Sequence, residues 1–193
     1  VFFERDMFDD TLSFADAHVS ILWRSVKLSL FTTALALLFG FPTAYFIATR
    51  AENRRDIWLF LITIPFWTNL LIRTFAMMEV IRNEGIINSG LMHLGIISEP
   101  IALLRNELGV MIGMVHYMIP FAVLPLYANM RGIDLRLVAA ARGLGASSWQ
   151  AFARVFLPLS MPGIVGAGVL VFIFSLGFYV TPAILGGGRV LLV

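Results

Sequence analysis

Residue types that could carry out covalent chemistry are scarce in this chain of 193 residues. Cysteine is absent, so thiolate nucleophiles, thiolate metal sites and disulfides are excluded. His116 has no cysteine or acidic partners of the kind that a metal site requires, so we expect no metal site. The pattern GxxxxGK[ST], which would cradle nucleotide phosphates, is also missing. The sequence therefore predicts that this chain is not an enzyme and holds no cofactor of its own.

Polar and aromatic side chains within long apolar stretches are better candidates for contact with a ligand. Asn69 and Arg73 are spaced i, i+4, which would place both on one face of a helix. Alternatively, Arg73 extends along its helix to the membrane surface, and both interpretations stay open. Trp67, Tyr117 and Tyr179 offer aromatic faces to a cation, although aromatic residues near the ends of membrane helices more often anchor the interface. These five residues are our candidates for a polar path through the apolar region.

The elements that must position these residues are long apolar helices. Apolar residues make up 59% of the chain and charged residues 13%, with a mean hydropathy of +0.87, which is unlike a soluble domain. A helix that crosses a bilayer needs about 20 apolar residues, because each residue rises about 1.5 Å and the hydrocarbon is about 30 Å thick. The predicted fold class is therefore an all-α polytopic membrane domain with four spans, and these are Leu28–Ala48, Ile57–Met78, Leu108–Met130 and Ile164–Leu185.

The distribution of charge predicts how these spans are oriented. The connections 50–56 and 131–158 together hold seven arginines and three acidic residues, whereas the other segments between spans and at the ends hold six basic and nine acidic residues. Lysine and arginine near span ends mark the cytoplasmic side, so both connections are predicted to be cytoplasmic. Residues 1–20 and 82–107 are then predicted to be extracytoplasmic. We treat residues 1–193 as one membrane domain and expect further spans to flank it.

The loop 131–162 contains the most informative pattern in the chain. Ala139–Ala141 are strong helix formers, and Gly143 and Gly145 interrupt the helix that they start. Ser147, with a glutamine three residues later, predicts a capping box that opens a second helix. The loop therefore predicts two short helices joined by a glycine elbow on the cytoplasmic surface.

The second predicted helix has an aromatic face. Pro158 and Pro162 are expected to end this helix before the next span. Two other uses of the face stay open: it could lie in the lipid interface, or the helix pair could bind DNA, which its short tether to two spans disfavours. The preferred interpretation is a face free to enter a groove of a partner protein, formed by positions i, i+3, i+6 and i+7, which are Trp149, Phe152, Val155 and Phe156.

The spacing within this loop resembles the cytoplasmic EAA loop of permease subunits in binding-protein-dependent ABC importers. The pattern consists of Ala139–Ala141, then Gly145 after three residues, and Val155–Pro158 after nine more. The resemblance extends from about residue 20 to the end of the chain. Outside the loop, four segments resemble the spermidine/putrescine branch of this family, and they are Gly40–Pro42, Ile64–Arg73, Ile119–Tyr127 and Gly177–Pro182.

The resemblance implies a mechanism for the loop. In this family a short coupling helix docks into a cleft of a cytoplasmic ATPase, and closure of the ATPase dimer on ATP moves the spans between inward-open and outward-open states. Ala139 departs from the family pattern, which has a glutamate there, so Arg136 or Arg142 would carry more of the polar contact. The residues that the resemblance assigns to this coupling loop are Ala139, Ala140, Ala141, Arg142, Gly145, Trp149, Phe152, Arg154, Leu157 and Pro158.

The resemblance also implies a function and a set of partners. The chain would be a translocation subunit of an ATP-driven importer in the bacterial inner membrane, with spermidine or putrescine as its cargo. Its expected partners are a second permease, two ATPase copies that bind ATP and magnesium, an extracytoplasmic solute-binding protein and membrane lipid, but no nucleic acid. Other cargoes stay open, namely iron(III), phosphonate, thiamine or opines. A secondary transporter or channel driven by an ion gradient is the alternative from another class.

Overall fold

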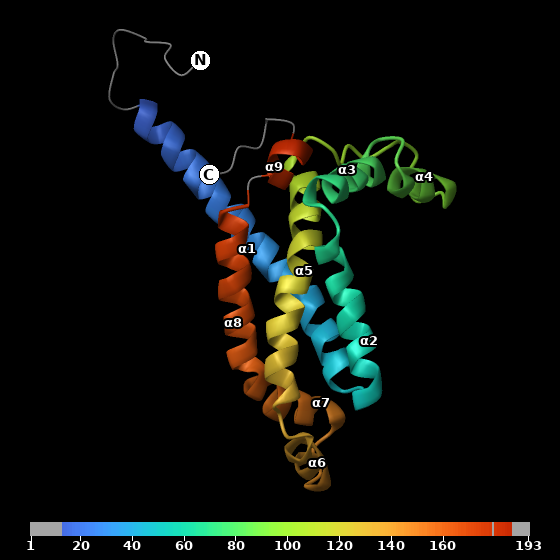
Figure 1. Cartoon of the computed structure of the whole chain (residues 1–193), viewed down its shortest axis with the longest axis vertical. Coiled ribbons are helices and arrows are strands. Elements are labelled where there is room, and N and C mark those ends of the chain that lie inside the picture. Colours follow the sequence, from blue (N-terminus) through green and yellow to red (C-terminus); the bar gives the residue numbers. More distant parts are fainter. Residues whose placement is uncertain (1–12, 179, 187–193) are drawn as a thin grey trace.

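Helices are the only regular elements in the part of the chain that this computed structural model describes, residues 13–178 and 180–186. The all-α fold class is thereby confirmed for these residues. Figure 1 shows the elements in chain order, and they are α1 (Ser13–Ala48), α2 (Glu52–Thr63), the 3₁₀ helix η1 (Ile64–Trp67), α3 (Leu70–Ile81), α4 (Ile86–His93), α5 (Glu107–Arg131), α6 (Leu135–Gly143), α7 (Ser148–Ala151), the π-helix η2 (Phe152–Phe156), α8 (Leu157–Leu176) and α9 (Val180–Leu185).

Helices long and apolar enough to cross a membrane form the body of the molecule. Three helical runs of the described residues meet this description, and they are Ile21–Ala48, Glu107–Arg131 and Ser148–Leu176. A fourth crossing results if the bent pair Glu52–Trp67 and Leu70–His93 counts as one span. Figure 1 shows α1, α2, α5 and α8 side by side along the long axis, so the four predicted crossings are all represented.

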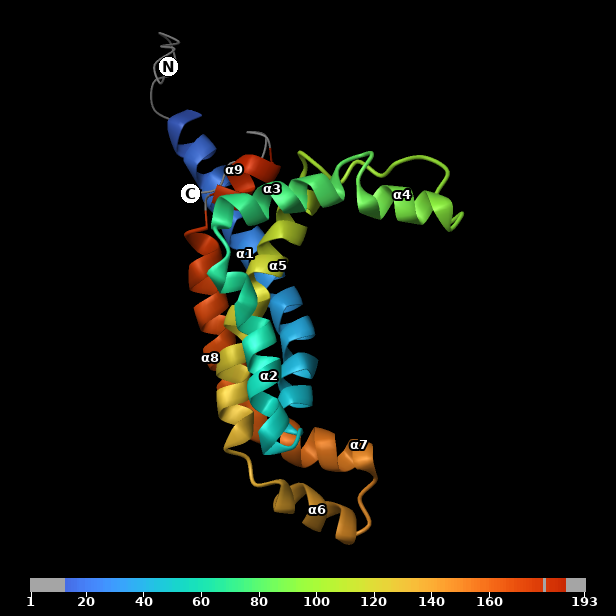
Figure 2. The same ribbon diagram turned by 45° about the vertical axis from the view of Figure 1, so that its right-hand side comes forward.

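The second predicted span is not one continuous helix. The helical runs Glu52–Trp67 and Leu70–His93, on either side of the break (residues 68–69), are bent by 96°, and Figure 2 shows α3 and α4 lying across the end of the bundle. Pro65 lacks an N–H and lies in the first turn of η1, while Asn69 has a non-helical ψ of 135° and caps α3. The prediction of a straight span over 57–78 is therefore wrong beyond Trp67.

The fourth predicted span is shifted toward the N-terminus. The helical run continues from Ser148 to Leu176, and α9 is a separate short helix after Gly177. The expectation that Pro158 and Pro162 end the preceding helix is wrong, because Pro158 lies in the first turn of α8, just after the π-turn η2, and Pro162 lies inside α8. A proline in an α-helix clashes with the carbonyl four residues earlier, and the wider π-turn, in which Leu157 N–H donates to the Phe152 carbonyl, provides room there.

Helix α5 lies at the centre of the bundle and packs against both α1 and α8. Two glycines allow these helices to approach closely. A Cβ on Gly40 would lie 3.0 Å from the Ala122 Cβ, and one on Gly163 would lie 2.6 Å from the Asn129 Cβ. Small residues at such crossings let helices pack in lipid, where no hydrophobic force drives them together. The packing of α1, α5 and α8 therefore forms the rigid support for both ends of the molecule.

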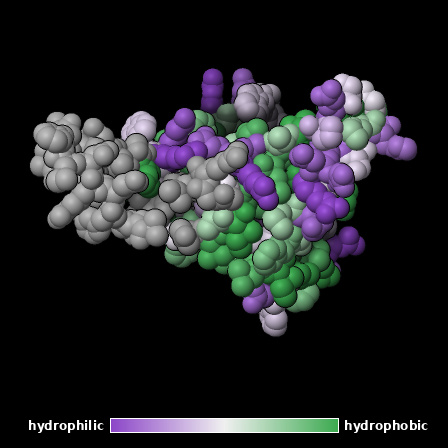
Figure 3. Space-filling model, turned by 90° about the horizontal axis from the view of Figure 1, so that it is seen from above, coloured by the Kyte–Doolittle hydropathy of each residue, from purple (hydrophilic) through white to green (hydrophobic). Residues whose placement is uncertain are grey.

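The two ends of the bundle differ in charge. The arginine-rich end comprises residues 50–56 and 131–158, and an ion pair of 3.7 Å between Arg131 and Glu52 joins its two segments. Figure 2 places α6 and α7 at this end and α3, α4 and α9 at the other, where Figure 3 shows hydrophilic and hydrophobic residues side by side. The two connections thus share one end, as the charge distribution predicted, and which side of the membrane they face stays a prediction.

The predicted extracytoplasmic segment 1–20 is described only in part. Residues 1–12 lie outside the described residues, and α1 begins at Ser13, well before the predicted start of the first span at Leu28. At this end of the bundle Arg24 of α1 forms an ion pair of 2.8 Å with Glu107 at the start of α5. Helix α1 therefore begins well before the apolar stretch Leu28–Ala48 that the sequence predicted as a span.

Candidate functional site

At the arginine-rich end, α6 and α7 form the predicted elbow (residues 135–151). Helix α6 ends in a Schellman motif, in which Ala146 N–H donates to the Ala141 carbonyl at 3.1 Å and Gly145 N–H to the Arg142 carbonyl at 3.0 Å. Gly145 has a φ of +92°, a conformation that residues with a side chain rarely adopt. The predicted glycine elbow is therefore present, and Gly145 is the residue that permits it.

The second helix of the elbow opens as the sequence predicted. Ser147 Oγ accepts from Gln150 N–H at 3.2 Å, and Gln150 Oε1 accepts from Ser147 N–H at 2.9 Å. These reciprocal bonds form a capping box, which satisfies two backbone donors at the start of the helix. The direction in which α7 leaves the turn is thus fixed by local hydrogen bonds.

The aromatic face of the second helix is only partly free. The Trp149 and Phe152 rings stack at 5.6 Å, and the Phe152 and Phe156 rings stack at 5.9 Å. Tyr45 of α1 packs edge-on against Phe152 at 5.6 Å and against Phe156 at 4.9 Å, and Phe156 is 2% exposed. The expectation of a wholly unpartnered face is therefore wrong, because two of its rings join the elbow to α1.

The outer surface of the elbow remains open to a partner. Trp149 is 71% exposed and Leu144 is 90% exposed. A hollow of about 500 Å³ lies between the two helices, lined by Ala139, Arg142, Ala146, Ser147 and Ser148. The other predicted coupling residues lie around it or on the following helix: Ala140, Arg154 and Pro158 are exposed, Ala141 and Leu157 are half-buried, and Gly145 has no atom within 4 Å of an added Cβ.

At the opposite end, Arg73 holds the break together. One guanidinium nitrogen, Nη2, donates to the carbonyl of Pro65 and, at 3.5 Å, to that of Thr68. Asn69 Oδ1 accepts from Leu71 N–H at 2.8 Å as the cap of α3. The predicted Asn69–Arg73 polar stripe on a continuous helix is therefore wrong, since Asn69 lies before the helix that carries Arg73.

Tyr117 of α5 is the aromatic partner of Arg73. The Arg73 Cζ lies 5.0 Å from the Tyr117 ring centroid, and Phe178 stacks on the same ring at 4.4 Å. Nε and Nη1 of Arg73 are buried and have no hydrogen-bond partner among the described residues. The cation–π contact with Tyr117 therefore stabilises the guanidinium charge in place of these hydrogen bonds. Trp67 is 82% exposed, and Tyr179 lies outside the described residues.

A small polar contact between α3 and α9 lies beside Arg73. Thr74 Oγ1 and Thr181 Oγ1 are 3.4 Å apart, and both residues are buried. They line a hollow of about 10 Å³ with Arg73, Gly113 and His116, among others, which is room for at most one water molecule. The threonine pair was not predicted from the sequence, where its only signal is two hydroxyl residues in apolar segments. His116 belongs to no group of three or more potential metal ligands among the residues described.

Replacing Arg73 with glutamine is expected to lower the free energy of unfolding by about 1–2 kcal/mol, because charge-assisted bonds to two carbonyls are lost from a partly exposed site. Arg82→Gln is the control, since Arg82 pairs at 3.1 Å with Glu79 on the surface and such pairs contribute little. The measurement is denaturant unfolding in detergent, and equal losses in both variants would contradict the role of Arg73 at the break.

A bundle of membrane-crossing helices with a two-helix elbow at its arginine-rich end defines a polytopic membrane protein. The comparison with known families agrees, since residues 36–192 match the family described as binding-protein-dependent transport system inner membrane component. The chain belongs to this family, which confirms the resemblance found in the sequence.

Individual members of this family are similar to the chain over most of its length. The chain is 41% identical over 180 residues to the spermidine/putrescine transport system permease protein PotB of Haemophilus influenzae, covering 93% of this chain and 63% of that protein. It is 37% identical over 176 residues to PotB of Escherichia coli K12, covering 91% and 64%. The chain thus spans slightly less than two-thirds of the length of these relatives.

Solved structures support the fold alone. A bacterial ABC transporter involved in the import of the acidic polysaccharide alginate matches with a TM-score of 0.52 and 21% identity, over 86% of this chain and 58% of that one. An amino acid ABC transporter matches with a TM-score of 0.50 and 19% identity, over 94% and 81%. The helical arrangement therefore corresponds to that of ABC transporter chains.

Proposed function

We propose that this chain is the permease subunit of an ATP-driven importer and that its elbow transmits the movement of a separate ATPase to the spans. The observation that supports this most directly is the aromatic ladder from Trp149 through Phe152 to Tyr45. It connects an exposed docking residue to a membrane-crossing helix. Movement of a partner against Trp149 would therefore reach α1 directly, as well as α8 through the chain.

Ala139, which stands where the family has a glutamate, lies beside Arg142 in the elbow. Ala139 and Arg142 line the same hollow, and Arg142 is exposed. Arg142 would supply hydrogen-bond donors and a positive charge to the partner, where the family glutamate would supply acceptors and a negative charge, so the polar contact would be of a different kind. We therefore infer that the ATPase meets this permease through Arg142, Arg154 and Trp149.

The proposed cargo is a polyamine, spermidine or putrescine, because the relatives of 37–41% identity are named for these compounds. The hollow beside Arg73 is too small for such a molecule. Tyr117 is already in contact with Arg73 and Phe178. We infer that the path lies on a surface shared with a second permease and that the exposed Trp67 borders it, whereas Asn69 and Arg73 orient the helices and Tyr179 stays a candidate.

The proposal includes the partners and the location of the complete protein. Two ATPase copies would bind ATP and magnesium at the arginine-rich end, so this chain would need no cofactor. An extracytoplasmic solute-binding protein would deliver the cargo at the other end, near α3 and α4. The membrane would be the bacterial inner membrane, with the arginine-rich end in the cytoplasm.

Transport by a reconstituted complex tests this proposal. Proteoliposomes would hold the complete polypeptide with its second permease and ATPase, with ATP inside and the binding protein outside. We expect uptake of labelled spermidine with the active ATPase and none with an ATPase variant unable to hydrolyse ATP. Uptake that persists with the inactive ATPase and follows an imposed ion gradient would instead favour a secondary transporter. If iron(III), phosphonate or thiamine inhibits the uptake of labelled spermidine and putrescine does not, the proposed cargo is wrong.

A further inference from the structure

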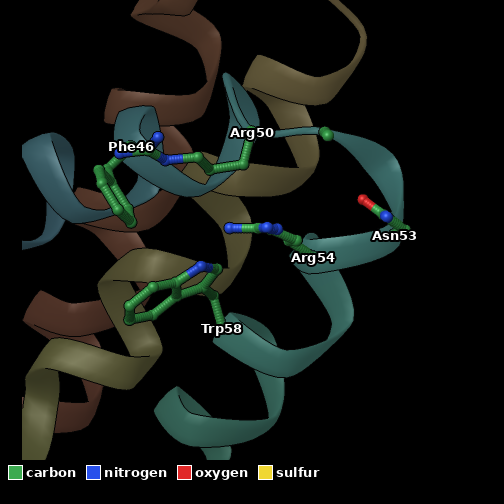
Figure 4. A pocket seen from close by; sticks show the side chains of 6 residues that line it. Phe46, Arg50, Asn53, Arg54 and Trp58 are labelled. Carbon is green, nitrogen blue, oxygen red and sulfur yellow. The ribbon is translucent and has the colours of Figure 1, made fainter.

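The junction of α1 and α2 contains a basic hollow that the proposed function does not use. Its volume is about 610 Å³, within the range of about 300–1,000 Å³ typical of sites for small ligands. Figure 4 shows the side chains of Arg50 and Arg54 approaching the same space, next to Trp58 and Phe46. The hollow is lined by Phe46, Arg50, Ala51, Asn53, Arg54 and Trp58.

The two arginines in this hollow carry charge that the described residues do not neutralise. Arg50 Cζ lies 4.0 Å from the centroid of the Phe46 ring, which holds the guanidinium over the hollow. Neither Arg50 nor Arg54 forms an ion pair with a carboxylate in the described part of the chain. Arg55 points its Nε back to the Arg50 carbonyl at 2.8 Å and so stabilises the turn. The hollow therefore presents two guanidinium groups suited to a phosphate.

An apolar hollow adjoins the basic one along α1 and α2. Its volume is about 440 Å³, and it shares Phe46 and Trp58 with the basic hollow. These two rings pack edge-on at 5.2 Å, so they form a common wall between the charged and the apolar part. The remaining lining lies toward the middle of the two helices and comprises Pro42, Thr43, Ile47, Leu61 and Ile62.

We propose that this composite groove binds an anionic phospholipid, with its phosphate on Arg50 and Arg54 and an acyl chain against Trp58 and Leu61. A charged hollow where α1, which is long enough to cross a membrane, meets α2, next to an apolar hollow along both helices, matches the layout of a lipid at the bilayer boundary. Basic residues at this depth attract anionic headgroups, and tryptophan is the residue typical of the headgroup level. The inference depends on the membrane orientation of α1 and α2 and not on the proposed transport activity.

Lipid binding to the complete polypeptide tests the charged half of the site. Native mass spectrometry of the purified protein would count bound phosphatidylglycerol and phosphatidylcholine during titration. The double variant R50Q/R54Q is expected to bind phosphatidylglycerol about 30-fold more weakly, or ~2 kcal/mol, without a change for phosphatidylcholine. The control R136Q/R142Q removes the same charge at the same end and is expected to bind normally. Equal losses of phosphatidylglycerol binding in both double variants would overturn the proposed site. If R50Q/R54Q does not fold, the single variant R54Q is measured in its place.

The apolar half of the site requires a separate test. Leu61→Asn places a polar group in the groove and is expected to weaken phosphatidylglycerol binding about fivefold. Leu38→Asn is the matched control on the exposed face of α1, outside the groove, and is expected to have no effect. Inorganic phosphate distinguishes a lipid from a free anion. Displacement of the lipid by millimolar phosphate, or normal binding by Leu61→Asn, would overturn the proposal.

Discussion

Replacing Gly145 with valine is expected to reduce ATP-driven uptake at least tenfold while leaving the protein inserted in the membrane. Gly145 has a φ of +92°, and no atom lies within 4 Å of an added Cβ, so the cost arises from the backbone and not from a clash. A β-branched residue there is strained by about 1–3 kcal/mol, and the elbow would relax to another angle. Trp149 would then no longer meet the ATPase. The measurement is spermidine taken up per ATP hydrolysed in proteoliposomes.

Gly143 provides the matched control for this substitution. It lies two residues earlier, also has no atom within 4 Å of an added Cβ, and has no positive φ. Gly143→Val is expected to retain coupled uptake, and Gly145→Asn is expected to fall between valine and wild type, because asparagine tolerates the left-handed region. If both valine variants lose uptake equally, the cause is side-chain volume on the elbow and not the conformation of Gly145.

Replacing Phe156 with alanine is expected to weaken the connection between the elbow and α1, which would then depend on the Phe152 ring alone. Phe156 is 2% exposed and packs against the rings of Tyr45 and Phe152. Its removal is expected to cost about 3 kcal/mol, the lower end of the range for such cavities, since burial from lipid contributes less than burial from water. ATP hydrolysis should continue while uptake per ATP falls severalfold. Thermal unfolding in detergent and the uptake assay measure the two effects.

Phe39→Ala is the control for the loss of an aromatic ring. Phe39 lies on α1, six residues before Tyr45, and is 53% exposed. Its truncation leaves no enclosed cavity, so both stability and coupling are expected to stay near wild type. A Phe156→Ala protein that is destabilised but fully coupled would show that the Phe156 ring contributes to stability and not to coupling.

Features set by neighbours in sequence were predicted well. The capping box of Ser147 and Gln150 and the interruption of the helix at Gly145 depend on residues within a few positions of one another. Their hydrogen bonds and backbone angles form in the same way wherever the segment lies. The number of apolar stretches was also predicted, because the requirement to cover the hydrocarbon acts on composition and length, although the bounds of the second and fourth spans were wrong.

Features that depend on packing were not predicted. Pro65 comes just before the break at residues 68–69, whereas the helix continues through Pro158. Arg73 donates to the carbonyls of Pro65 and Thr68 beside the break, and a π-turn accommodates Pro158. A proline pattern alone does not distinguish the two. The same limit explains Thr74 and Thr181, which are 107 residues apart in sequence and meet only because α9 returns to α3.

The sequence by itself determined the helical class, the apolar spans, the concentration of arginine in two connections and the local geometry of the elbow. These follow from composition, spacing and hydrogen bonds between near neighbours. Only the tertiary structure decided that Arg73 joins two helices across a break and that Phe152 and Phe156 pack on Tyr45. It also decided that Arg50 and Arg54 share a groove with Trp58. The ring contacts depend on how helices distant in sequence approach one another, and no single segment contains that information. The contacts of Arg73 and the groove of Arg50 and Arg54 lie within single segments, 65–73 and 46–58, but depend on how the two helices of each segment are turned against each other.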